Sequence, residues 1–146
     1  MKNLKGGERL QAKLMEIAEK FQGSVKVGWM SGGPYSDGTP VAAVAAWNEY
    51  GVPELNIPPR PFIRNMISEK DEEWANRLEG AAKYYNYDGE KVLKSMGLSI
   101  LEDMQQAILD FKDPRNADST IAKKGFDKPL IHTGHMKDSI TYLVDV

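Results

Sequence analysis

The amino-acid sequence predicts one α+β domain in which a small antiparallel sheet packs against two long helices and several shorter ones. Residues 25–30 and 140–146 place apolar side chains at every second position, as strands with one buried face do. Residues 61–86 and 89–111 instead repeat apolar side chains at helical spacing. The 146 residues suit a single domain, and they contain no internal repeat and no linker. We expect the two strands to pair, and the long helices to pack on them.

The remaining elements follow from apolar stripes and from residues that end helices. An N-terminal amphipathic helix ends before Gly23, and an alanine-rich helix at about 40–50 ends at Gly51. Asp88 suits the cap of the helix over 89–111, which should run antiparallel to the one before it. The apolar stripe of the first helix consists of Leu10, Leu14, Ile17, Ala18 and Phe21.

Two segments have the composition of mobile loops. Residues 31–40 and 112–128 are rich in glycine, proline and polar side chains, which bury too little surface to order themselves. Within the second segment, residues 118–124 favour one or two helical turns. We expect both loops to be mobile in the isolated subunit and to become ordered on assembly.

Composition and motifs argue against most classes of enzyme. The net charge of −2 creates no general attraction for nucleic acid or anionic lipid, and the absence of cysteine excludes thiolate chemistry and disulfides. No apolar run reaches the length of a membrane span. Phosphate-binding loops, zinc helices, nucleophile elbows and dinucleotide fingerprints are missing from the sequence. We therefore predict no catalytic residue, no metal and no cofactor.

Two groups of titratable residues are candidate sites. His132 and His135 stand three apart and would need a third ligand to bind zinc, which the sequence does not offer convincingly. The adjacent carboxylates of Glu72–Glu73 and Glu102–Asp103 point in different directions on their helices. We interpret these carboxylates as solvated helix faces and predict no metal site at the histidines.

The region from Trp47 to Arg64 is the candidate docking surface. It combines aromatic and arginine side chains, the types enriched at interface hot spots, with prolines 58, 59 and 61, which stiffen the backbone before binding. Lysines in the basic segment 112–128 could also contact a partner. The predicted interface residues are Trp47, Tyr50, Arg60, Phe62, Arg64, Lys123 and Lys124.

Three blocks in this order resemble the tail-completion, or neck, proteins of tailed bacteriophages, also called head–tail joining, minor tail or virion morphogenesis proteins. The resemblance covers about residues 24–146, although family members often carry an acidic residue where His132 stands. The blocks are Ala46-Trp47-Asn48-Glu49-Tyr50-Gly51, Ile57-Pro58-Pro59-Arg60-Pro61-Phe62, and Ser119 to Gly125 followed by Lys128 to Met136 and Ser139-Ile140.

The resemblance implies a structural virion protein, made in the host cytoplasm, that joins the head connector to the tail. It implies a homo-oligomeric ring, hexameric in such proteins, between the connector or adaptor and the tail tube or tail terminator, with DNA contact only in the lumen. An alternative from a different class is a DNA-contacting or regulatory binding domain that uses the basic segment 112–128. A third is a metal-dependent enzyme that uses His132 and His135.

Overall fold

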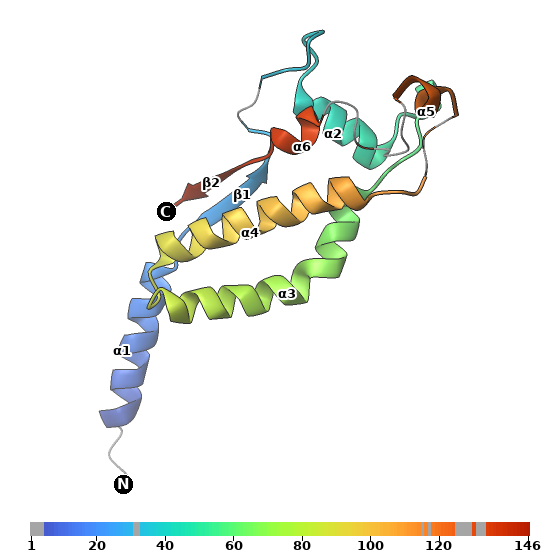
Figure 1. The fold of residues 1–146 in the computed structure, drawn as a ribbon. Helices are drawn as coiled ribbons and strands as arrows, with labels where there is room; N and C mark the ends of the chain where they lie inside the picture. Colours follow the sequence, from blue (N-terminus) through green and yellow to red (C-terminus); the bar gives the residue numbers. More distant parts are fainter. Residues whose placement is uncertain (1–4, 31–32, 115, 117, 125–129, 131–133) are drawn as a thin grey trace.

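The computed structural model of the chain describes residues 5–30, 33–114, 116, 118–124, 130 and 134–146. The fold is α+β, as predicted: α3 and α4 form an antiparallel pair, and α4 lies against a two-stranded sheet (Figure 1). In chain order the elements are α1 (Lys5–Lys20), β1 (Ser24–Gly28), α2 (Val41–Tyr50), the 3-10 turn η1 (Pro53–Leu55), α3 (Phe62–Tyr84), α4 (Gly89–Asp110), α5 (Asp118–Lys124), α6 (His135–Asp138) and β2 (Thr141–Asp145).

The sheet joins two segments that lie far apart in the sequence. β1 and β2 pair antiparallel, with Val25 opposite Val144, which confirms the predicted pairing of the two strands. Helix α4 approaches this sheet closely at Gly97, where an added Cβ would lie 2.5 Å from Tyr142 Cδ2 and 2.9 Å from Val25 Cγ2. A larger residue at position 97 would therefore push α4 away from the strands.

The α3–α4 pair is held by a cap at its turn and by a polar cluster along its length. The Asp88 carboxylate accepts the N–H of Lys91 at 3.3 Å, so it caps α4 as predicted. Further along, Asp103 Oδ2 accepts hydrogen bonds from Trp74 Nε1 at 2.7 Å and from Arg77 Nη1 at 2.8 Å. Our interpretation of Asp103 as solvated is wrong, because its side chain faces α3 and is only 13 % exposed. Neighbouring residues on a helix point about 100° apart, so Glu102 remains exposed.

The main core lies where α2, α6 and β1 meet the end of the α3–α4 pair that holds Phe62 and Ile108. Phe62 packs edge-on against Trp29, with ring centroids 6.2 Å apart. The Trp29 indole N–H in turn donates to the Met136 carbonyl at 2.7 Å, so this large ring buries no unsatisfied donor. The buried residues of this cluster are Val41, Ala45, Phe62, Met66, Met104, Ile108, Leu130, Met136 and Ile140.

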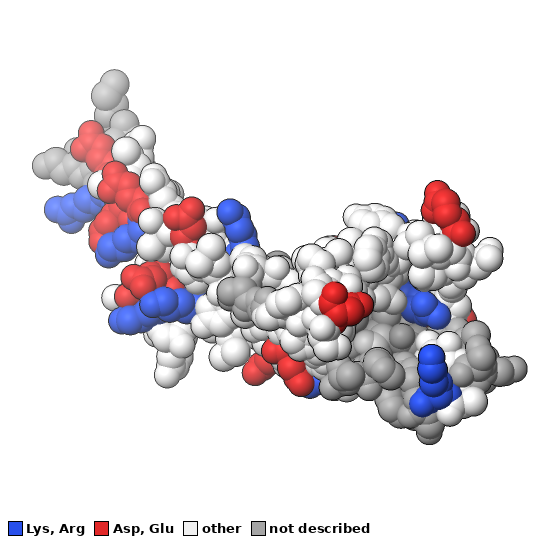
Figure 2. All heavy atoms as spheres, turned by 90° about the horizontal axis from the view of Figure 1, so that it is seen from above, with Lys and Arg blue, Asp and Glu red and all other residues white. Residues whose placement is uncertain are grey.

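Helix α1 extends away from this body as an arm (Figure 1). Residues 6–16 are all exposed, including Leu10 at 61 % and Leu14 at 56 %. The arm joins the body at its C-terminal end, where Phe21 packs against Tyr87 and Lys20 approaches the first residue of α4. Acidic and basic side chains are interspersed along the arm, which lies at the left of Figure 2. The first predicted helix therefore forms, but most of its apolar stripe has no cover within the described chain.

The two segments predicted to be mobile lie partly outside the described residues, and their mobility stays a prediction. In the described part of the first segment, the N–H of Tyr35 donates to the Thr39 carbonyl at 2.9 Å. Asp37 Oδ1 accepts the N–H of Thr39 at the same distance. The second segment contains α5, at the position where helical turns were predicted.

Candidate docking surface

The connection between α2 and α3 is held by backbone hydrogen bonds at both ends. Gly51 ends α2 with φ +73°, and a Cβ at this position would lie 2.8 Å from the Ile57 carbonyl oxygen, so glycine is needed here. Val52 and Ile57 then form an isolated bridge, with the Val52 N–H donating to the Ile57 carbonyl at 2.9 Å. After the prolines, the Arg60 N–H donates to the Asn48 carbonyl at 2.5 Å. The proline segment is thus fixed against α2.

Glu49 links α2 to the beginning of α3. Its carboxylate accepts the N–H of Ile63 at 2.9 Å and the N–H of Arg64 at 3.1 Å, although its side chain is only 4 % exposed. These are amides of the first helical turn, which have no partner within the helix. Pro61, the residue before α3, makes no side-chain cap bond, so Glu49 takes over that role from another helix. A negative charge at this position is also favoured by the helix dipole.

Arg64 and Tyr50 form the exposed layer above this buried carboxylate. Arg64 Nε donates to Glu49 Oε1 at 2.8 Å, and Arg64 Nη2 donates to the Glu49 carbonyl at 2.9 Å. The Arg64 guanidinium carbon lies 5.2 Å from the centre of the Tyr50 ring, within the range of a cation–π contact. The Arg64 side chain is still 56 % exposed and Tyr50 is 69 % exposed. Both residues are thus accessible, and their role in an interface stays a prediction.

Two predicted interface residues point inward instead. Phe62 is 1 % exposed and belongs to the core, because it begins α3 on the face that packs against Trp29. Arg60 is 9 % exposed, and its Nε donates to the carbonyl of Pro114 at 3.3 Å. Burial lowers the pKa of the Arg60 guanidinium. The prediction that these two side chains are presented for docking is wrong. Both are buried beneath the exposed residues of the surface and pack against the interior.

A groove of about 570 Å³ lies beside this junction. Trp47, which is 49 % exposed, and Ile57 lie along it, and Thr120 of α5 adds a further wall. The groove thus brings α2, the proline loop and α5 to one surface. The lining residues are Val44, Trp47, Asn48, Asn56, Ile57, Pro58, Arg60, Asn116 and Thr120.

The predicted basic residues can be placed only in part. Lys123 is exposed on α5, whereas the side chain of Lys124 and residues 125–129 lie outside the described part of the chain. The alternative of a DNA-contacting segment over 112–128 therefore stays a prediction.

Of the two histidines, His135 is described and His132 is not. His135 Nε2 donates to the Gly33 carbonyl at 2.7 Å, Ser139 Oγ lies 3.3 Å from its Nδ1, and Tyr35 packs edge-on against its ring. These contacts give the imidazole a structural role between the segment after β1 and α6. Within the described ranges, no three His, Asp or Glu side chains gather as metal ligands would.

The residue that our sequence reasoning missed is Glu49. It appeared only as part of a motif, although a signal was present: it is the single charged residue of α2. A lone carboxylate in an otherwise uncharged helix needs a partner if the helix is buried. The partner lies in α3, fourteen residues further along the chain, so the sequence could indicate the need but not the identity of the partner.

Comparisons of the chain with protein-family models, with curated proteins and with solved structures find no match. No helix in the described portion is both long and apolar enough to cross a membrane.

Proposed function

We propose that this chain is a non-enzymatic structural protein that assembles into a homo-oligomeric ring in the neck of a tailed bacteriophage. The ring would lie between the head connector and the tail and would be part of the virion. The hexameric count, the virion neighbours and the passage of DNA through the lumen come from the family resemblance of the sequence.

The observation that carries the proposal is the amount of surface that the single chain exposes. Its solvent-accessible area is 9976 Å² for 16.3 kDa. A compact monomer of that mass exposes about 7,500 Å². An excess of roughly 2,500 Å² on these figures is of the size that permanent subunit interfaces bury. Such a surface is typical of a chain that completes its burial in an assembly.

The position of the exposed apolar side chains supports the same proposal. Leu10 and Leu14 lie on the arm, whereas Trp47 and Tyr50 lie on α2, at the other end of the molecule (Figure 1). Contacts made by two different ends of one subunit are heterologous, and heterologous contacts generate a ring when their rotation closes. Exposed apolar surfaces at two separate ends of the subunit therefore suit a ring better than a two-fold dimer.

The test is deletion of the gene from the phage that encodes this chain, combined with electron microscopy of the purified chain. We expect heads and tails that are both formed but not joined, rescue by the gene supplied in trans, and closed rings of uniform size at high protein concentration. Normally joined, infectious particles from the deletion phage would overturn the neck proposal. A chain that stays monomeric at every concentration would contradict ring formation by the chain alone.

A further inference from the structure

The arm presents an apolar stripe with one basic flank. Leu10, Leu14 and Ile17 follow the four-three spacing of a helix that packs against another surface. On one side of this stripe lie Lys13 and Lys20, whose side chains are 62 % and 50 % exposed and both bond to Glu16. On the other side lie two residues without charge, Gln11 and Ala18.

This arrangement argues against two arms pairing with each other. In an antiparallel pair of arms, the basic flank of one helix would face the basic flank of the other. In a parallel pair, the lysines would face the uncharged flank and gain no attraction. Phe21 already packs against Tyr87 within the chain, so the free stripe covers only about two turns. Such a short pair of helices is marginal in water.

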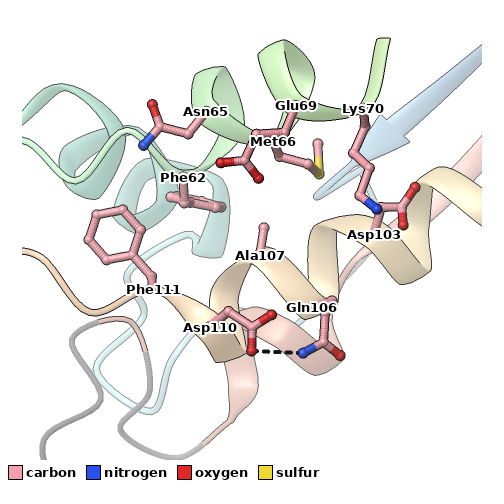
Figure 3. Close-up of a pocket in the computed structure, with 10 residues that line it drawn as sticks. All are labelled: Phe62, Asn65, Met66, Glu69, Lys70, Asp103, Gln106, Ala107, Asp110 and Phe111. Atoms are coloured by element: carbon pink, nitrogen blue, oxygen red, sulfur yellow. Dashed lines mark hydrogen bonds between the residues drawn. The ribbon is translucent and has the colours of Figure 1, made fainter. Parts of the chain in front are cut away.

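A cleft of about 350 Å³ with the complementary character lies between α3 and α4 (Figure 3). Its floor is apolar, formed by the half-buried Ala107 and Phe111 over the core residues Phe62 and Met66. Its rims carry the exposed carboxylates of Glu69 on α3 and Asp110 on α4.

The charge of this cleft is net negative. Besides the two rim carboxylates, Asp103 and Lys70 line it, so three carboxylates face one ammonium group. Lys70 forms an ion pair with Glu73, and Asp103 forms one with Arg77 of α3, so the rim carboxylates carry the negative charge that a partner would meet. A helix with an apolar stripe and one basic flank matches the floor of this cleft in hydrophobicity and one of its rims in charge.

The cleft and the root of the arm lie at opposite ends of the α3–α4 pair. The arm joins the body where Lys20 meets Gly89: a Cβ on Gly89 would lie 1.8 Å from the Lys20 carbonyl oxygen. The cleft lies around Ala107, eighteen residues further along α4, which is about 27 Å of helix. Because the arm points away from the body (Figure 1), it does not reach the cleft of its own chain.

We propose that the arm of one copy docks in the α3–α4 cleft of the next copy, with Leu14 over the apolar floor and Lys13 and Lys20 beside one of the two acidic rims. The inference rests on the proposed ring and specifies its contact. Each copy offers an arm and a cleft at different ends, so the contact repeats around an axis.

The test uses cysteine cross-linking, for which the chain is suited because it contains no cysteine. Leu14→Cys and Gln106→Cys place thiols on the arm and on the exposed lining of the cleft. Mixing the two variants under mild oxidation should give a disulfide-linked pair of one copy of each. Leu98→Cys, on the same helix but outside the cleft and 49 % exposed, is the matched control and should cross-link far less.

A second measurement separates a head-to-tail contact from a two-fold one. Leu14→Asp disables the arm, and Glu69→Lys with Asp110→Lys disables the cleft. Each should weaken self-association about thirtyfold or more. Mixed together, they should form a one-to-one dimer, because each supplies the half that the other lacks. Asp71→Lys with Glu102→Lys makes the same charge change on exposed residues outside the cleft and should leave association intact.

Two results would overturn this contact: Leu14→Cys cross-linking to itself as readily as to Gln106→Cys, or a mixture of the two disabled variants that stays monomeric. Either could occur while the wild-type chain still forms rings, and then the ring proposal stands with another interface. Conversely, joined particles from the deletion phage would refute the neck role, whatever the cross-links show.

Discussion

The α2–α3 junction and the arm use similar kinds of residues in opposite ways. At the junction, Phe62 is 1 % exposed and belongs to the main core, and Glu49 is 3 % exposed and bonds to α3. On the arm, Leu10 and Leu14 are more than half exposed and contact little of the chain. The buried residues of the junction have completed their packing, whereas the leucines of the arm have not.

Residue type alone therefore does not identify a docking surface. Aromatic and arginine residues are frequent in interface hot spots, yet Arg60 and Phe62 serve the interior here. The leucines of the arm are common core residues, yet they provide the uncovered apolar surface. The two regions differ in whether other residues of the same chain bury these side chains.

The largest change in the free energy of unfolding is expected for a substitution in the core of the junction, and a substitution on the arm provides the contrast. Phe62→Ala should lower the free energy of unfolding by about 3–5 kcal/mol, because it leaves a cavity in the core. Leu14→Ala should change it by less than about 0.5 kcal/mol, because the exposed leucine supports nothing within the monomer. Urea denaturation of both variants, at a concentration where the chain is monomeric, provides the measurement. Equal losses in the two variants would mean that the arm is part of the monomer core.

A smaller effect is expected from the carboxylate that links α2 to α3. Glu49→Ala leaves two amides of α3 and Arg64 Nε without their acceptor, which should cost roughly 2–3 kcal/mol. Glu49→Gln keeps one acceptor oxygen and should cost less. Glu54→Ala, an exposed carboxylate in η1, is the control. If Glu49→Ala unfolds at the same urea concentration as the control, the carboxylate is not the cap that joins the helices.

The smallest effect concerns Asp88, at the turn where the arm meets the body. The N–H of Lys91, followed by the Lys91 side chain, holds the pKa of Asp88 below its usual value. A lowered pKa in the folded state stabilises above the unfolded pKa of about 3.9, and that contribution is lost as the pH falls through the folded value. Asp88→Asn should therefore keep most stability at pH 7 but flatten its decline below about pH 4. Melting temperatures from pH 2 to 7 measure this, and an unchanged acid slope would contradict it.

The fold class, the pairing of the two strands and the two long helices could be predicted because each has a periodic pattern within its own segment. The Asp88 cap was predictable for the same local reason. Glu49 and Asp103 were not, because their roles depend on partners in another helix that no local pattern reveals. For the candidate surface, Trp47, Tyr50 and Arg64 are exposed and their interface role stays a prediction, whereas the burial of Phe62 depends on Trp29 and the rest of the core, which no local pattern reveals.

The pairing of β1 with β2 also bears on the order in which the chain folds. Gly28 and Thr141, which share a hydrogen bond at the edge of the sheet, are 113 positions apart. Bringing such distant segments together costs loop entropy before any contact offsets it. The α3–α4 pair closes through residues 85–88 and needs no such step, so local contacts favour its earlier formation. The arm is followed along the chain by β1, whose partner strand is made only when synthesis reaches residue 145. A nascent chain short of that point therefore lacks the sheet, and the contacts of Phe21 and Lys20 with the turn between α3 and α4 hold the arm to the helix pair.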